Sequence, residues 1–357
     1  MDTPQWRLAP AATLIPGLPI EPGLSERLLG ALSDAPEPFA VRLMRPLPPI
    51  PAGERVIPAD QTNHSVIVGE TVVVKWFARP SDDSPAPELF AHLAVVGFGR
   101  IAEPYAAVFC GEALLALVTA YLPEATDGWE WCVDEAVSGG TAFAGELGRI
   151  AAELHVAMAT PSPVWPEPVR MAAGSWFGRA GEALAEALRV TEDAEDSAWL
   201  AAHEGDLRRE LAPLAVAGET PVLRIHGDLH VGQVLRWRDG FAVVDFDGNP
   251  TVTEALPYQP AARDLAQLAT SLEHVAQVAV KRREADPQAM VAWAWMTREA
   301  LETAYVATLA EAGRSELLDR SLVRPFEVEQ ECRELIYAAR HLPRWRYAPM
   351  GVLRSWF

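Results

Sequence analysis

The chain of 357 residues is poor in cysteine and in basic residues. Its three cysteines, Cys110, Cys132 and Cys332, are an odd number without the spacing of metal ligands, so we expect reduced thiols and no disulfide framework. With 30 Lys and Arg against 49 Asp and Glu, the net charge is −19. Such an acidic chain is unsuited to binding nucleic acid or an anionic membrane surface.

Long apolar runs are also missing. No stretch reaches the ~20 apolar residues of a membrane-spanning helix, and the first residues, MDTPQWRLAP, lack the basic start and apolar core of a signal peptide. We therefore expect a cytoplasmic protein without a membrane partner. Half of the residues are hydrophobic and 22 % are charged, which is typical of a globular enzyme with two domains or two lobes. The oligomeric state stays open, and a monomer is compatible with the sequence.

The most informative stretch is RIHGDLHVGQVLRWRDGFAVVDFDGNP, residues 224–250. It predicts a short strand, a loop that holds His226-Gly227-Asp228, a hairpin, and a second loop that holds Asp245-Phe246-Asp247. The hairpin is indicated by two β-rich runs on either side of Asp239-Gly240, a strong turn signal.

Four polar side chains flank this hairpin. Because a hairpin brings its two ends together, we expect Asp228 and Gln233 to lie near Asp245 and Asp247. Carboxylate and amide oxygens are the ligands that Mg²⁺ prefers in proteins. The sequence therefore predicts a site for Mg²⁺ and the phosphates it carries.

This arrangement resembles the catalytic core shared by protein kinases and aminoglycoside phosphotransferases. The resemblance implies that Asp228 is the base that accepts the proton of the acceptor hydroxyl, and that Asp245 binds Mg²⁺. Gln233 stands where most of the family has a metal-binding Asn, and its amide oxygen can still bind the ion. Asp247 is expected to join a second metal or to face the acceptor. The motifs HGDLHxxQVL and DFxGxP are most similar to those of the maltokinase branch.

The same resemblance implies an α+β, two-lobed, protein-kinase-like fold that binds ATP between its lobes. We expect an N-terminal cap at residues 1–60, a mainly β N-lobe at 61–123 and a helical C-lobe at 124–357. Helices are predicted over 143–158, from Asp264 onward, over 287–313 and over 326–341. By resemblance, Asp264 braces the catalytic loop.

The nucleotide is expected on a predicted hairpin, QTNHSVIVGETVVVKWF, whose Gly69-Glu70 favours a type II′ turn. Lys75 corresponds to the lysine that pairs ATP phosphates, with Glu88 as its partner on the next helix. Residues 61–65, before this hairpin, occupy the position of the kinase phosphate-binding loop; they lack its glycines but are polar. Residues 121–123 are predicted to form the hinge between the lobes. The nucleotide-binding residues predicted for these two segments are Thr62, Asn63 and Ser65, then Tyr121 and Leu122.

The acceptor is expected to be a sugar, because the match is to sugar and antibiotic kinases and the Ala-Pro-Glu motif that protein kinases carry after the Asp-Phe-Gly loop does not follow Asp245-Phe246-Asp247 here. Asn249 and Glu254 depart from the DFEGEP loop usual in maltokinases, which argues against maltose. Glucosamine kinases resembling maltokinases are known, and a protonated amine requires a carboxylate. We therefore favour phosphorylation of glucosamine to glucosamine 6-phosphate, with maltose and aminoglycosides as alternatives. The predicted substrate residues are Asp228, His230, Asn249, Glu254, Glu329, Glu334, Tyr337 and Trp345, with Asp247 as a further acid.

Two interpretations of another class remain. His226, Asp228 and His230 alternate, so on a continuous strand they would share one face and could bind Zn²⁺ in a hydrolase. That interpretation leaves the second acidic loop unexplained, and Gly227 and Gly232 argue against an unbroken strand. The other alternative is a catalytically inactive protein that binds a sugar or a nucleotide.

Overall fold

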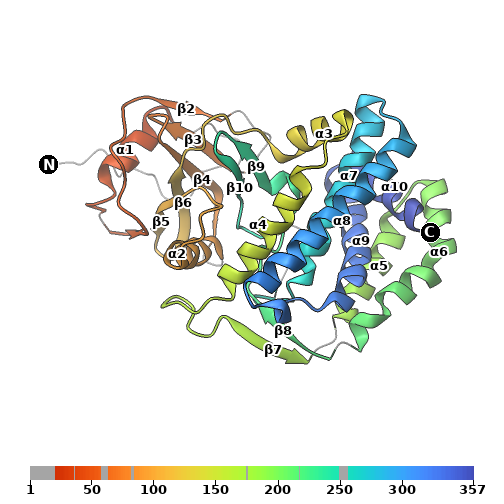
Figure 1. The fold of residues 1–357 in the computed structure, drawn as a ribbon. Coiled ribbons are helices and arrows are strands. Elements are labelled where there is room, and N and C mark those ends of the chain that lie inside the picture. The colour runs from red at the N-terminus through yellow and green to blue at the C-terminus, as the bar shows by residue number, and fades with distance from the viewer. Residues whose placement is uncertain are drawn as a thin grey trace. The chain divides into compact units, whose positions relative to one another are not determined.

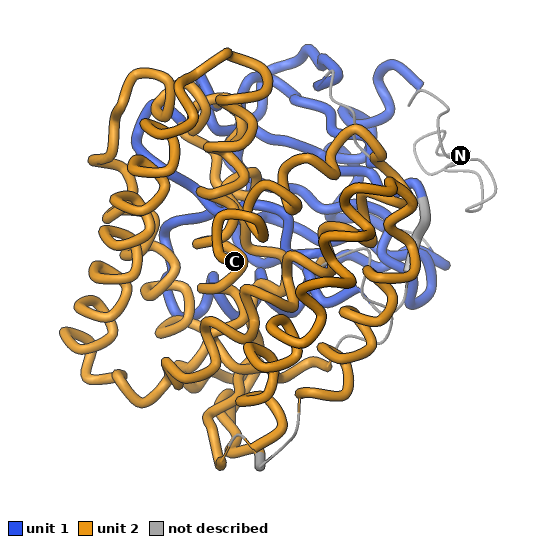
Figure 2. The backbone as a smooth tube through the Cα atoms, turned by 90° about the vertical axis from the view of Figure 1, so that its right-hand side faces the viewer, with its two compact units in different colours: residues 1–125, 237–247 blue, residues 126–236, 248–357 orange. Residues whose placement is uncertain are grey.

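The computed structural model describes residues 21–35, 37–57, 63–81, 84–173, 176–216, 218–248 and 256–357. The chain divides into two compact units (Figure 2): unit 1 comprises residues 1–125 and 237–247, and unit 2 comprises 126–236 and 248–357. Three residues predicted to contact ligands, Thr62, Asn249 and Glu254, lie outside the described residues. None of the described helices is both long and apolar enough to span a bilayer.

Unit 1 is built on an antiparallel six-stranded sheet of order β1-β5-β6-β4-β3-β2 (Figure 1). Strands β1 and β2, which belong to the predicted cap, pair with β5 and β3 of this sheet. A cap that forms a separate subdomain stays a prediction. The strands are β1 (Phe39–Leu43), β2 (Glu54–Val56), β3 (His64–Val68), β4 (Val72–Ser81), β5 (Pro104–Cys110) and β6 (Ala113–Ala120); the helices are α1 (Leu24–Ala31) and α2 (Ala86–Val96).

Along β4, side chains that pack into the core of unit 1 alternate with side chains on the opposite face, where Lys75 lies. Val72, Val74 and Trp76 are at most 1 % exposed and join a hydrophobic cluster with Leu28 of α1. The indole Nε1 of Trp76 also donates to the hydroxyl of Ser25 at 3.0 Å. Because successive side chains of a strand point to opposite faces, Lys75 faces away from this cluster.

The turn between β3 and β4 differs from its prediction. Gly69 and Glu70 both have positive φ, 59° and 48°, which is typical of a type I′ turn rather than the predicted type II′. Its closing hydrogen bond runs from Thr71 N to Val68 O at 3.1 Å. The sequence identified the hairpin, but it did not show that Glu70 adopts a left-handed conformation.

Unit 2 is mainly helical. Helices α4 and α8 pack against each other, and α7 packs against both α8 and α9 (Figure 1). The helices are α3 (Gly128–Ser138), α4 (Phe143–Met158), α5 (Phe177–Val190), α6 (Ala194–Leu211), α7 (Ala262–Arg283), α8 (Pro287–Glu311), α9 (Val323–His341) and α10 (Tyr347–Trp356). Strands β7 (Val169–Ala173) and β8 (Glu219–Leu223) form an antiparallel pair. The hairpin of β9 (Val234–Trp237) and β10 (Gly240–Val243) is present where the sequence predicts it, and β10 is counted with unit 1.

The predicted helices of unit 2 are confirmed, with shifted ends. One face of α4 is apolar and buried, and it consists of Phe143, Leu147, Ile150, Ala151, Leu154 and Met158. Helix α7 begins at Ala262 and α9 at Val323, both earlier than predicted. Helix α8 begins at Pro287 as expected, because Asp286 caps it by accepting a hydrogen bond from Ala289 N at 2.8 Å.

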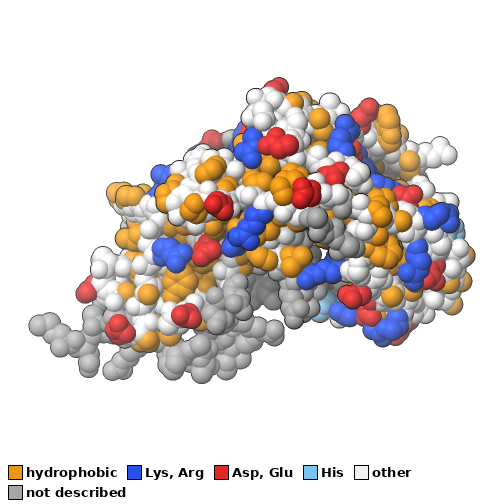
Figure 3. All heavy atoms as spheres, turned by 90° about the horizontal axis from the view of Figure 1, so that it is seen from below, with side chains coloured by type: hydrophobic (Ala, Val, Ile, Leu, Met, Phe, Trp, Pro, Cys, Tyr) orange, Lys and Arg blue, Asp and Glu red, His pale blue; other side chains and the backbone are white. Residues whose placement is uncertain are grey.

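Although the chain carries a large net negative charge, its acidic side chains do not gather in one patch on the face shown in Figure 3. Acidic, basic and apolar side chains are interspersed there. Several exposed arginines pair with a glutamate one turn away on the same helix, such as Arg189 with Glu186 and Arg208 with Glu204. Exposed pairs of this kind contribute at most about 0.5 kcal/mol each. They therefore neutralise local charge more than they stabilise the fold.

Candidate functional site

The first cluster of functional residues lies in unit 1, around Lys75 of β4. Its Nζ donates to Oδ1 of Asp245 at 2.5 Å and to Oδ2 of Asp247 at 2.6 Å. Phe246, between the two acids, is 1 % exposed and packs edge-to-face on Phe90 of α2 with ring centroids 5.2 Å apart. The buried phenylalanine anchors the loop after β10, so both carboxylates reach the same cation.

The electrostatics of this cluster suit a second cation. Burial, together with the charge of Asp245, raises the pKa of Asp247 to about 6, although the charge of Lys75 lowers it. Oδ1 of Asp247 is buried and has no hydrogen-bond partner among the described residues. An unpaired buried carboxylate oxygen is costly, and a hard divalent cation such as Mg²⁺ would satisfy it. The residues present therefore fit a bound Mg²⁺.

Lys75 itself remains charged. Burial lowers its pKa, but the charges of Asp247 and Asp245 outweigh that effect and leave the pKa raised. The predicted partner, Glu88, is exposed in the first turn of α2. In the described part of the chain the ion pairs of Lys75 are with Asp245 and Asp247, not with Glu88. A role of Glu88 as the partner of Lys75 stays a prediction.

The polar segment predicted to meet the phosphates begins at β3. Ser65 lies opposite Lys75 in the sheet and is nearly buried, at 9 % exposed. Asn63 Oδ1 accepts a hydrogen bond from the backbone N–H of Ala78 at 3.3 Å, which ties the start of β3 to β4. The contact of these residues with a nucleotide stays a prediction.

The segment predicted as a hinge follows β6. The N–H of Tyr121 donates to Thr71 O at 2.9 Å, and its hydroxyl accepts from Arg55 Nη2 at 3.1 Å. The guanidinium of Arg55 also lies over the Tyr121 ring at 5.6 Å. Leu122 is buried, with 8 % of its surface exposed. These contacts fix the backbone after β6, while adenine binding at this place stays a prediction.

The second cluster lies in unit 2, in the loop after β8. The carboxylate of Asp264, on α7, accepts hydrogen bonds from the backbone N–H groups of His226 and Gly227 at 2.8 and 2.9 Å. It also lies 3.1 Å from Nε2 of the buried His155. Gly227 has φ of 82°, a conformation that suits glycine. Asp264 therefore braces the loop that carries Asp228, as the sequence predicts.

The carboxyl group of Asp264 is ionised. Burial alone would raise the pKa of Asp264, but the hydrogen bond and charge of His155, the charge of His226 and the N–H of Gly227 together lower it. A buried carboxylate that accepts several N–H bonds is stable in its charged form. The position of the loop thus depends on one fully buried anion.

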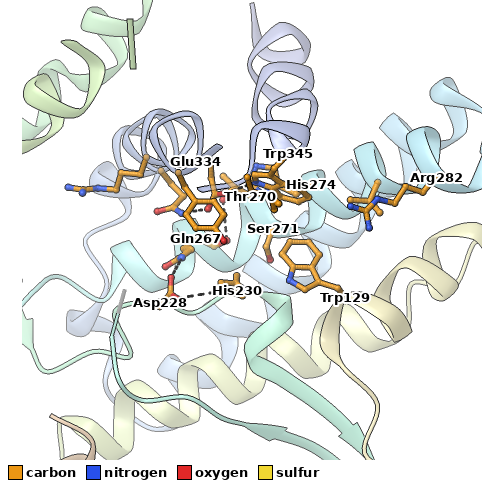
Figure 4. Close-up of a pocket in the computed structure, with 15 residues that line it drawn as sticks. Trp129, Asp228, His230, Gln267, Thr270, Ser271, His274, Arg282, Glu334 and Trp345 are labelled. Atoms are coloured by element: carbon orange, nitrogen blue, oxygen red, sulfur yellow. Dashed lines mark hydrogen bonds and ion pairs between the residues drawn. The ribbon is translucent and has the colours of Figure 1, made fainter. Parts of the chain in front are cut away.

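Asp228 lies at the edge of a cavity of about 410 Å³ (Figure 4). Its Oδ1 accepts a hydrogen bond from Gln267 Nε2 at 2.7 Å, and its Oδ2 lies 3.9 Å from His230 Nε2. The cavity is formed by α3, the loop after β8, α7, α9 and the short turn Pro343–Trp345. Three residues predicted to bind substrate besides Asp228 and His230 line it: Glu334, Tyr337 and Trp345.

Glu334 is held in place by two neighbours. Its Oε2 accepts from the indole Nε1 of Trp345 at 2.8 Å, and its Oε1 accepts from Gln330 Nε2 at 3.0 Å. The Trp345 ring meets that of Trp129 edge-to-face at 5.5 Å. The cavity therefore combines a fixed carboxylate with aromatic walls, an arrangement that suits a cationic, partly apolar ligand.

Glu329 has another role than the predicted one. It is fully buried, and its two oxygens accept from the guanidinium of Arg263 at 3.1 and 3.0 Å, while Arg333 binds the first of them as well. These charges hold the pKa of Glu329 below its usual range against the effect of burial. Glu329 is not among the residues that line the cavity, because its carboxylate links α7 to α9.

A zinc site is not formed by the residues considered for it. His226 Nδ1 accepts from the N–H of Asp228 at 3.3 Å, within a loop rather than a strand. Among the described residues, which include His226, Asp228 and His230, no three His, Cys, Asp or Glu side chains are grouped as metal ligands.

Comparison with known proteins decides the family. The chain is 40 % identical over 320 residues to a glucosamine kinase of Streptacidiphilus jiangxiensis, a match that covers 83 % of this chain and 72 % of the relative. This chain belongs to the glucosamine kinase family. A second glucosamine kinase, from Mycolicibacterium smegmatis, is 37 % identical over 319 residues, covering 84 % of this chain and 79 % of the relative.

A solved structure agrees. A glucosamine kinase in complex with glucosamine, ADP and inorganic phosphate superposes with a TM-score of 0.81 and 35 % identity, over 96 % of this chain and 84 % of the other. The kinase-like α+β fold predicted from the sequence is confirmed for this member of the glucosamine kinase family. No protein-family model matches the chain.

Sequence reasoning missed several residues that line the cavity in this glucosamine kinase relative. Trp129 lines the cavity but is not among the predicted site residues, and α7 contributes a polar row that was not predicted either. The signal was present, because these polar side chains recur at i, i+3, i+4 and i+7 in a helix otherwise rich in apolar residues. The row consists of Gln267, Thr270, Ser271 and His274.

Proposed function

We propose that this protein transfers the γ-phosphoryl group of ATP to glucosamine and forms glucosamine 6-phosphate. The observation that carries the proposal is the cavity that holds Asp228 and Glu334 together in unit 2. One carboxylate suits deprotonation of a hydroxyl, and the other suits binding of an ammonium group. The relatives named as glucosamine kinases support the same acceptor. ATP and a free sugar as substrates, together with three unpaired cysteines, support a cytoplasmic location.

Asp228 orients the acceptor hydroxyl and takes its proton as the new P–O bond forms. The hydrogen bond from Gln267 fixes one carboxylate oxygen, which fixes the direction of the side chain. Asp264 fixes the backbone of the same loop. Most of the rate acceleration then comes from alignment, since phosphoryl transfer requires little covalent chemistry from the protein.

Lys75, Asp245 and Asp247 act on the phosphates of ATP. Asp245 and Asp247 would hold Mg²⁺, and a role of Gln233 as a metal ligand stays a prediction from the sequence. Mg²⁺, when bound, neutralises phosphate charge. Lys75, which contacts both carboxylates in this structure, would pair with the phosphates of ATP. The unpartnered Oδ1 of Asp247 supports this arrangement.

Glu334 receives the 2-ammonium group of the sugar. Its two oxygens accept one hydrogen bond each from Trp345 and Gln330, and an ionised carboxylate can accept about four. Two acceptor positions therefore remain for N–H donors. The aromatic faces of Trp129 and Trp345 add cation–π attraction. Of the acids considered from sequence, Glu329 is already saturated by arginines.

The decisive experiment is a coupled assay for ADP release with purified protein, ATP and Mg²⁺. The acceptors compared are glucosamine, N-acetylglucosamine, glucose, maltose and an aminoglycoside. We expect the highest kcat/KM for glucosamine and loss of activity on acetylation, which removes the positive charge. Equal turnover of glucosamine and N-acetylglucosamine refutes recognition of the amine. Faster turnover of maltose refutes the proposed acceptor.

A further inference from the structure

Behind the wall of the sugar cavity lies a second acid that the proposed reaction does not use. Glu331, on α9, is fully buried and is not among the residues that line the cavity. Its Oε2 lies 2.9 Å from Nε2 of His274, on α7, which does line the cavity. The order from the cavity inward is therefore His274 and then Glu331.

The hydrogen bonding of Glu331 indicates a protonated carboxyl. Its Oε1 is buried without a hydrogen-bond partner among the described residues. A neutral carbonyl oxygen tolerates this far better than an anionic one. Burial also raises the pKa of Glu331 well above its usual value, the charges of Glu334, Glu273 and Glu327 raise it further, and Arg298 opposes them only in part.

A protonated Glu331 determines which ring nitrogen of His274 carries hydrogen. The O–H of Glu331 donates to Nε2, so Nε2 is an acceptor and the proton of the neutral ring sits on Nδ1. The ring is neutral because burial lowers the pKa of His274, although the charges of Glu334 and Glu273 oppose this. Nδ1 has no hydrogen bond to another described residue, and the small exposed part of the ring borders the cavity.

Building on the proposed function, we propose that Glu331 is a positioning residue that fixes His274 as an Nδ1–H donor to an oxygen of the sugar. The Trp345 ring, edge-to-face with His274 at 5.5 Å, keeps the imidazole from turning. The cavity then has two complementary ends. Glu334 accepts from the ammonium group, and His274 donates to the ring oxygen, which carries no hydrogen, so the amino sugar binds in one orientation.

Loss of one proton from the Glu331–His274 pair reverses the direction of the hydrogen bond between them. When the proton leaves to solvent, Glu331 becomes a carboxylate, Nε2–H donates to it, and Nδ1 becomes an acceptor that no longer matches a sugar oxygen lacking hydrogen. We therefore expect weaker sugar binding at alkaline pH. The charged groups that face the pair are Glu273 and Arg282 of α7, Glu327, Arg333 and Glu334 of α9, Arg298 of α8, and Asp228 and His230 of the loop after β8.

Two substitutions separate this role from mere packing. In Glu331→Gln the amide N–H₂ still donates to Nε2, so Nδ1–H is kept; in Glu331→Met the donor is lost at similar volume. For Met we expect the KM for glucosamine to rise roughly 3- to 10-fold with kcat nearly unchanged, the loss of about one neutral hydrogen bond. For Gln we expect a KM within about 2-fold of wild type at neutral pH and a smaller alkaline rise than in wild type, since only the loss of the sugar's own ammonium charge remains. The matched control is Glu327→Gln, a buried acid one turn earlier on α9 that pairs with Arg298 and Arg324, which should leave KM unchanged.

The outcomes are distinguishable. If the wild type does not phosphorylate glucosamine, the proposed function fails. If it does, and the Met variant has the KM of the wild type or the Gln variant is as impaired as Met, the positioning role fails. A direct measurement needs neither activity nor a stable Glu331 variant: ¹⁵N NMR of histidine-labelled wild type, with His274→Asn for assignment. An Nδ1–H tautomer supports the inference, and an Nε2–H tautomer at neutral pH overturns it.

Discussion

Gln267 donates a hydrogen bond from Nε2 to Oδ1 of Asp228 at 2.7 Å. Both residues are nearly buried, at 4 and 9 % exposed, so the bond is protected from water. Gln267 lies on α7, less than one turn after Asp264, which holds the backbone of the loop that carries Asp228. A single helix thus fixes both the backbone and the side chain of the proposed base.

Replacing the base should abolish most of the activity without affecting the nucleotide. For Asp228→Asn we expect kcat to fall on the order of 10²–10⁴-fold, the usual contribution of a general base. Calorimetric binding of ATP with Mg²⁺ should be nearly unchanged. Asp239→Asn, in the turn of the β9–β10 hairpin, is the control and should retain full activity. Near-normal phosphoryl transfer by Asp228→Asn contradicts the assignment of the base.

Asp264→Asn tests the brace. The amide keeps one acceptor, but its N–H₂ faces backbone donors, so we expect a loss of about 3 kcal/mol in the free energy of unfolding, typical of a broken buried charge network. Because the folded-state pKa of Asp264 is lowered, its contribution is present above the unfolded pKa and is lost as pH falls. The stability difference in urea unfolding should therefore shrink towards low pH. The control, Asp286→Asn at the N-cap of α8, should cost at most about 0.5 kcal/mol, since Asn also caps helices.

The elements that the sequence predicted best are those with local signals. Asp239-Gly240 predicts the turn of the β9–β10 hairpin, and apolar residues that recur with the period of a helix predict α4. These signals depend on residues within one or two turns of each other. The handedness of the turn at Glu70 depends on its backbone conformation, which residue type does not determine.

The site was harder to predict, because its contacts join residues far apart in the sequence. The motifs predict Asp228, Asp245 and Lys75 as site residues, but they do not show that Lys75 forms ion pairs with both Asp245 and Asp247. Similarly, an acid on α9 can face the cavity, as Glu334 does, or it can form an ion pair with an arginine, as Glu329 does. These two positions are five residues apart and lie on different faces of the helix, so only packing separates their roles.

Lys75→Met tests the alignment of ATP. The strand should form without the charge, since methionine matches the volume of lysine, but Asp245 and Asp247 lose their shared cation. We expect a higher KM for ATP and a lower kcat, with far-UV circular dichroism unchanged. Lys281→Met, at the end of α7, is the control because the chain contains only these two lysines. Unchanged ATP kinetics identify Lys75 as a structural lysine only.

Glu327 should make the stability of the protein depend on pH around neutrality. Burial, aided by the charge of Glu273, raises the pKa of Glu327 to about 7 despite Arg298 and Arg324. A raised folded-state pKa gives a contribution that is complete below the unfolded value of 4.5 and is lost as pH rises through about 7. Thermal unfolding between pH 5 and 8.5 should therefore show a steeper fall in Tm for wild type than for Glu327→Gln. The difference corresponds to at most about 3 kcal/mol, and parallel curves contradict it.

Glu334→Gln tests recognition of the amine. The substitution keeps the shape and an acceptor for Trp345, but removes the charge that faces the sugar ammonium. A hydrogen bond to a charged group contributes about 1.5–3 kcal/mol, so kcat/KM for glucosamine should fall roughly 10- to 100-fold. Glucose has no ammonium group, and its kcat/KM should change little or rise. The two sugars are therefore assayed with the same enzyme preparation, which makes the ratio of their kcat/KM values independent of any loss of folded protein. A ratio that stays at the wild-type value places the amine elsewhere, and Asp247→Asn is then the next variant to assay.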